Sequence, residues 1–74
     1  MNETAALHPL RKWREAAEHT QEWCAEQVGT TRQVWSDWER RRRIPNRTYM
    51  PRVVALTGGE VTADKFYPPL TEAA

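Results

Sequence analysis

Residues 20–39 read TQEWCAEQVGTTRQVWSDWE, and this stretch decides the fold of the chain. Apolar residues recur at helical spacing in two runs, one on each side of Gly29. Thr20 precedes the first run and Thr31 precedes the second, and threonine is a favoured N-cap residue. Gly29 can take the left-handed conformation that ends a helix and turns the chain sharply. The stretch therefore predicts two short helices joined by a tight turn.

Two such helices are typical of a helix-turn-helix, whose second helix can enter the major groove of DNA. The first helix would bury Cys24, Ala25 and Val28. The second, over residues 32–39, would bury Trp35 and Trp38, whose indole N–H groups then need partners.

A further helix is predicted before this motif, over about residues 9–18. Pro9 suits its first turn, where a missing N–H costs nothing. Leu10, Trp13 and Ala17 follow at a spacing of three to four residues and form its apolar face.

Two more helical segments are predicted after the motif. Thr48 would cap the first, with Pro51 in its first turn and Gly58-Gly59 at its end. Its apolar face would comprise Val53, Val54 and Leu56. Thr62 would cap a last helical turn over residues 63–67. No stretch alternates as a strand does, so the fold class is predicted to be all-α: a compact bundle of four to five short helices.

Length and composition limit the other possibilities. Seventy-four residues allow one domain, expected to span residues 1–74 with its core at about 7–69. A single cysteine, Cys24, excludes an intramolecular disulfide. No apolar run approaches the roughly 20 residues of a membrane span, and the first residues lack the order of a secretory signal. A cytoplasmic protein is expected, in a bacterial or phage-infected cell and associated with the nucleoid.

Positive charge is confined to the middle of the chain. Residues 32–52 hold seven arginines against Asp37 and Glu39, which gives +5, whereas residues 1–31 and 53–74 each carry −2. A basic block of this kind favours nucleic acid as the partner, and the alternative is a merely solvated arginine face.

Eight residues stand at the spacing of the lambda-repressor/Cro-like (XRE-type) helix-turn-helix family, which the chain resembles over about residues 7–69. They are Gln21, Ala25, Gly29, Ser36, Trp38, Glu39, Arg42 and Pro45. The stretch ALTGGEVTADKFYPP also resembles the ending of small phage-type repressors. The resemblance implies an all-α bundle that binds operator DNA as a homodimer and represses transcription in a phage or prophage.

The resemblance also implies which residues contact double-stranded DNA. Gln21 would open the first helix of the motif and touch a phosphate, assisted by the helix N-terminus. Arg32 and Gln33 would open the recognition helix and read bases, since arginine matches guanine and glutamine matches adenine. The alternative is that both contact only phosphates. Ser36 and Asp37 lie one turn further along the same face.

The remaining polar residues have more than one possible role. Thr31 would cap the recognition helix or bond a phosphate. Asp37 would accept from cytosine N4 or orient a neighbouring arginine, and we favour the second role. Five arginines cannot all reach phosphates from one short loop, so we expect two or three contacts from Arg40, Arg41, Arg42, Arg43 and Arg47. Arg14 and Glu39 occupy positions that commonly form an internal ion pair. The expected DNA-binding residues are Gln21, Thr31, Arg32, Gln33, Ser36, Asp37, Arg40, Arg42, Arg43 and Arg47.

Three residues depart from the family's pattern. Arg41 stands where glycine is usual, which puts the local turn geometry in question. His19 replaces a buried aliphatic residue. Trp23 replaces an outer polar one, and it could pack on a sugar-phosphate edge, cover a neighbouring helix or join a protein contact.

No catalytic, metal or cofactor motif accompanies these features. Cys24 and His19 do not reach the ligand count of a zinc site, and no phosphate-binding glycine loop or nucleophile elbow is present. An enzyme, a metal, a cofactor and a small-molecule ligand are therefore not expected.

The dimer contact is expected in the C-terminal part, where apolar residues exceed what a four-helix core needs. These are Val61, Phe66, Tyr67, Pro68 and Leu70. Two other functions remain open: the antitoxin of a toxin–antitoxin pair, which represses its own operon, and an architectural module that binds DNA without sequence preference.

Overall fold

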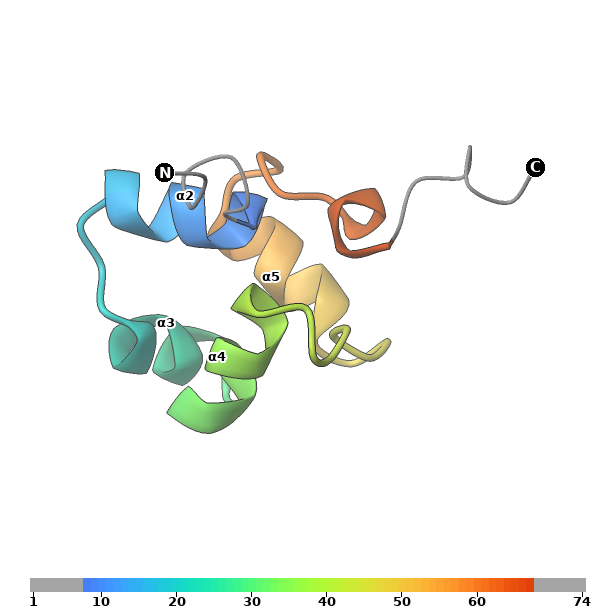
Figure 1. Ribbon diagram of the computed structural model, residues 1–74, viewed down its shortest axis with the longest axis horizontal. Helices are drawn as coiled ribbons and strands as arrows, with labels where there is room; N and C mark the ends of the chain where they lie inside the picture. The colour runs from blue at the N-terminus through green and yellow to red at the C-terminus, as the bar shows by residue number, and fades with distance from the viewer. Residues whose placement is uncertain (1–7, 68–74) are drawn as a thin grey trace.

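Four α-helices and one 3₁₀ turn make up residues 8–67, the part of the chain that the computed structural model describes (Figure 1). The elements are α2 (Pro9–Ala16), α3 (Gln21–Val28), α4 (Arg32–Glu39), α5 (Met50–Leu56) and η1 (Ala63–Phe66). α3 and α4 lie together on one side of the molecule, α2 lies across from them, and η1 lies beyond α5. Residues 8–67 contain no strand, and the prediction of an all-α bundle is confirmed.

The ends of α3 and α4 are formed as the sequence predicts. The Thr20 hydroxyl accepts from the backbone N–H of Trp23 at 3.0 Å, and the Thr31 hydroxyl accepts from that of Val34 at 3.2 Å. Gly29 ends α3 with a φ of 85°, in the left-handed region that its missing Cβ permits. Two threonine caps and one glycine thus fix where the two helices of the motif begin and turn.

The first helix is shorter than predicted. α2 ends at Ala16, and Ala17 is exposed rather than part of the buried face. The cause is Glu18, which adopts a left-handed φ of 61°. The N–H of His19 then donates to the carbonyl of Arg14 at 3.1 Å, a closure typical of a helix C-terminus.

Two of the predicted cap hydrogen bonds do not form. The N-cap of α5 is Tyr49, not Thr48, and it makes no side-chain cap bond; Asn46 Oδ1 accepts from the N–H groups of Thr48 and Tyr49 at 2.9 and 3.0 Å in the turn before the helix. Asparagine forms such turns more readily than threonine. Thr62 stands at the predicted N-cap position of η1, but its hydroxyl makes no cap bond and donates instead to the carboxylate of Asp64.

Nine apolar residues form the buried core: Leu10, Cys24, Ala25, Val28, Trp35, Trp38, Val53, Val61 and Phe66. The predicted burial of the two tryptophans is confirmed. Val61 and Phe66 are also buried, so the expectation that they supply surface for a dimer contact is wrong. They are buried because η1 packs over the start of α2. There the ring centroid of His8 lies 4.7 Å from that of Phe66. Tyr67 is exposed, whereas Pro68 and Leu70 lie outside the described residues.

Candidate nucleic-acid interface

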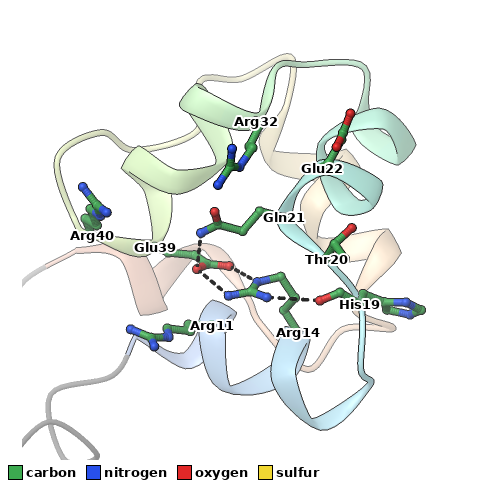
Figure 2. Close-up of a pocket in the computed structure, with 9 residues that line it drawn as sticks. All are labelled: Arg11, Arg14, His19, Thr20, Gln21, Glu22, Arg32, Glu39 and Arg40. Atoms are coloured by element: carbon green, nitrogen blue, oxygen red, sulfur yellow. Dashed lines mark hydrogen bonds and ion pairs between the residues drawn. The ribbon is translucent and has the colours of Figure 1, made fainter.

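A buried carboxylate joins the helices around the candidate interface. Arg14 donates to Glu39 through Nε at 2.6 Å and through Nη2 at 3.2 Å, which confirms the predicted ion pair (Figure 2). Trp35 Nε1 donates to the same carboxylate at 2.6 Å, and Gln21 Nε2 at 3.0 Å. The hydrogen bond with Glu39 raises the pKa of Arg14 further above its usual value. One carboxylate thus ties α2, α3 and α4 together.

Two of these contacts were missed in the sequence. Trp35 was expected to need a partner, but Glu39 lies one turn away on the same helix and could have been named. Gln21 was assigned only to a phosphate, whereas here its amide is held by Glu39 at the N-terminus of α3. One amide hydrogen and the carbonyl oxygen of Gln21 remain for another contact.

Four arginines from three parts of the chain surround this cluster and form a hollow in the surface (Figure 2). The lining of this arginine hollow comprises Arg11, Arg14, His19, Thr20, Gln21, Glu22, Arg32, Glu39 and Arg40. The N-terminus of α3, which carries the positive end of the helix dipole, opens beside it. Several cations and a helix N-terminus around one hollow suit an anionic group such as a phosphate.

Arg11 belongs to the hollow although the sequence analysis did not select it. It precedes Arg14 by three residues and therefore lies on the same side of α2. Its Nε lies 2.9 Å from Oε2 of Glu15, and both side chains are about half exposed. A pair this exposed is weak, so Arg11 can exchange its partner at little cost.

The outer face of α4 presents polar side chains. Thr31, Arg32 and Gln33 are exposed at its start, while Ser36 and Asp37 are partly buried one turn later. Gln33 Nε2 donates to Oδ1 of Asp37 at 3.2 Å, and Arg43 Nε lies 3.4 Å from Oδ2. Asp37 therefore contacts a neighbouring arginine, as the favoured interpretation predicts.

A cationic loop follows α4 directly. Arg40, Arg41, Arg42 and Arg43 are all exposed, and so is Arg47 in the turn before α5. The backbone N–H of Arg42 donates to the carbonyl of Asp37 at 2.9 Å, which holds the loop against the end of the helix. The exposed arginines of the loop are thus held at the C-terminal end of α4.

A family model described as "Helix-turn-helix domain" matches residues 8–62, from the N-cap of α2 to the N-cap of η1. The chain belongs to this helix-turn-helix family. Membership is consistent with the XRE-type resemblance and indicates a DNA-binding regulator, and the family is generally non-enzymatic. The same comparisons found no significant match among curated proteins or solved structures.

Arg41, where the sequence left the turn geometry in question, adopts a left-handed conformation. Its φ is 63°, in the region that glycine favours. A residue with a Cβ is strained in this conformation, at about 1–2 kcal/mol. The Nη1 of Arg41 donates to the carbonyl of Lys65 at 3.4 Å, the long hydrogen bond by which this side chain reaches η1.

His19 and Trp23 replace the usual residues with an aromatic stack. Their ring centroids lie 3.9 Å apart with an interplanar angle of 17°, and the ring centroid of Trp13 lies 5.7 Å from that of His19. Trp23 thus packs on His19, which lies in the connection between α2 and α3 rather than in a helix. The side chain of Trp23 remains 38% exposed.

The remaining chemistry within residues 8–67 is limited. The described part holds no cluster of His, Cys, Asp or Glu able to bind a metal ion. Burial raises the pKa of the Cys24 thiol to about 11, so this side chain is protonated at neutral pH and serves in packing. None of the described helices has the length and apolar character needed to cross a membrane.

Proposed function

We propose that this protein is a sequence-specific, double-stranded DNA-binding transcriptional regulator that places α4 in the major groove. The observation that carries the proposal is the exposure of Arg32 and Gln33 at the start of the second helix of the motif. Their side chains match the acceptor and donor edges of guanine and adenine. Ser36 and Thr31 flank them on the same face and supply hydroxyl groups.

Phosphates would be held at two places around this reading helix. One place is the arginine hollow, which Arg11, Gln21 and Arg40 line together. The loop with Arg42 and Arg43 lies at the far end of α4, followed by Arg47. Contacts to phosphates carry most of the affinity of such proteins and position the helix without reading sequence.

We further propose that two copies bind an inverted-repeat operator and repress transcription, in a phage or prophage setting. One helix-turn-helix reads few base pairs, so high specificity requires two half-sites about one DNA turn apart. Because Val61 and Phe66 lie in the core, the dimer contact would use other exposed apolar side chains, such as Ile44 and Tyr67. Light scattering of the saturated complex tests this point: two chains per operator are expected, and one chain would exclude the dimer.

The function is tested by selecting bound duplexes from a random pool with the full chain. A single enriched sequence pattern is expected from the wild-type protein. The Arg32→Ala/Gln33→Ala double variant should lose that pattern, while Gln27→Ala, on the exposed side of α3, should keep it. Equal binding of all duplexes by the wild-type protein would contradict sequence-specific regulation and favour an architectural role.

A further inference from the structure

Asp37 is the residue at which the reading helix and the cationic loop meet. Its carboxylate accepts from Gln33 at Oδ1 and faces Arg43 Nε at Oδ2, 3.4 Å away. Its backbone carbonyl accepts from the N–H groups of Arg42 and Arg43 at 2.9 and 3.4 Å. The Asp37 side chain is 13% exposed, whereas that of Arg43 is 61% exposed. The carboxylate therefore holds two side chains that are otherwise free to move in solvent.

The negative charge of Asp37 should weaken DNA binding, whereas the positive charges of the arginines around it should strengthen it. Asp37 lies on the proposed DNA-facing surface, between a helix that would enter the groove and a loop that would follow the phosphates. A carboxylate there repels every duplex alike, because phosphates occur in every sequence. It also offsets part of the positive charge of Arg43. Its presence should therefore lower the affinity for DNA of any sequence.

The hydrogen bond to Gln33 has a different effect. Gln33 loses rotamer freedom in the free protein, so less conformational entropy remains to be lost on binding. Its Oε1 and second amide hydrogen stay available, which are the two groups that a bidentate contact with adenine requires. The smaller entropy loss strengthens binding only to a duplex that presents adenine to Gln33.

We propose that Asp37 is a positioning residue for sequence specificity: it fixes the side chains of Gln33 and Arg43, and thereby lowers non-specific affinity while raising discrimination. This inference rests on the proposed function. The Asp37 carboxylate would raise the ratio of specific to non-specific affinity without raising the affinity for DNA in general.

The test measures binding of the full chain to two duplexes, the sequence best enriched by the wild-type protein and a scrambled duplex of the same length. Asp37→Ala should bind the scrambled duplex several-fold more tightly, since one repulsive charge is removed. The ratio of the two affinities should fall by about tenfold. A variant that merely weakened the fold would lose affinity for both duplexes. Glu26→Ala removes the same charge from an exposed site on α3 and serves as the matched control.

Two further variants show whether Asp37 acts through Gln33. In a Gln33→Ala background, Asp37→Ala should leave the affinity ratio nearly unchanged, because the side chain it positions is absent. Asp37→Asn keeps an oxygen that can accept from Gln33 and should therefore retain more of the ratio than Asp37→Ala. This variant preserves the size of the side chain and carries the test if the alanine variant does not fold.

Four outcomes would overturn the proposal. An equal loss of the ratio in both backgrounds would mean that Asp37 reads a base itself. An unchanged ratio in Asp37→Ala, or an equal loss in Asp37→Ala and Asp37→Asn, would mean that the hydrogen bond to Gln33 is immaterial. A wild-type protein without sequence preference would overturn the proposed function as well, which separates that failure from the other three.

Discussion

Arg14 Nε lies 2.6 Å from Oε2 of Glu39, and this ion pair joins α2 to the last turn of α4. The side chains of Arg14 and Glu39 are only 13% and 3% exposed. Two more donors, from Trp35 and Gln21, reach the same carboxylate. The orientation of α4 relative to α2 and α3 therefore depends on Glu39.

Replacing Glu39 by alanine should destabilise the protein by about 3–5 kcal/mol, because it leaves a largely buried guanidinium and an indole N–H without their acceptor. A domain of this size has a free energy of unfolding of only about 5 kcal/mol or a little more. Urea unfolding followed by circular dichroism measures the loss. The control is Glu15→Ala, which removes the exposed partner of Arg11 and should change stability by less than about 1 kcal/mol. Equal effects of the two substitutions would contradict the account of the buried pair.

Replacing Arg41 by glycine should stabilise the protein relative to Arg41→Ala. Both variants lose the same side chain beyond Cβ, but only glycine adopts a φ of 63° without strain. The strain of about 1–2 kcal/mol exceeds the extra backbone entropy that glycine loses on folding, so a net difference of about 1 kcal/mol is expected. Denaturant midpoints of the two variants measure it. If Arg41→Ala proved as stable as Arg41→Gly, the turn would not be strained.

Acid should destabilise the protein through His8. Burial, and then the charge of Arg41, lower the pKa of His8 from 6.5 to about 4. The neutral ring caps α2, since its Nδ1 accepts from the N–H of Leu10 at 2.9 Å, and its Nε2 has no partner within residues 8–67. His8 binds its proton more readily in the unfolded chain than in the folded protein. The stability that neutral His8 contributes to the fold is therefore fully present above pH 6.5. It is lost as the pH falls from 6.5 towards about 4, by about 3 kcal/mol in total.

The matched variant for this prediction is His8→Asn, which supplies a cap acceptor but does not titrate. Its unfolding free energy should vary less between pH 6.5 and 4 than that of the wild-type protein. The difference between the two pH profiles isolates His8 from the carboxylates, which titrate in both. Parallel profiles would show that His8 is not responsible.

Removing an arginine from the loop should weaken binding to all duplexes alike. Arg42→Ala, if Arg42 contacts a phosphate, should flatten the slope of log affinity against log salt concentration by about 1. Lys12→Ala removes one positive charge from an exposed site on α2 outside the arginine hollow, and should leave the slope nearly unchanged. A changed base preference with an unchanged slope would instead mean that the loop reads bases.

The sequence predicted those parts of the fold that depend on local signals. The Thr20 and Thr31 caps, the Gly29 turn and the two buried tryptophans all follow from residue type and helical spacing, and all are present. The ion pair of Arg14 and Glu39 came from the family resemblance rather than from any local pattern.

What the sequence did not predict depends on contacts between distant segments or on competing local residues. Whether Phe66 is core or surface is decided by η1 closing over the start of α2, far away in sequence. Thr48 does not cap α5, because it lies in the turn that Asn46 Oδ1 closes just before the helix. The left-handed Glu18 carries no sequence signal, since glycine or asparagine is the usual residue there. For the candidate interface, Asp37 was expected to orient a neighbouring arginine, but which arginine it faces depends on the geometry of the loop. Its bond to Gln33, four residues earlier on α4, was missed although the spacing permits it.

Base reading by α4 through Arg32 and Gln33 is measured by the affinities of Arg32→Ala and Gln33→Ala for every single-base-pair variant of the best selected duplex. Each substitution should cost about 1–3 kcal/mol on the selected sequence and abolish the preference at one or two adjacent positions, leaving the other positions unchanged. Wild-type preference at every position in both variants would contradict this expectation, and would mean that α4 does not read the sequence through these side chains.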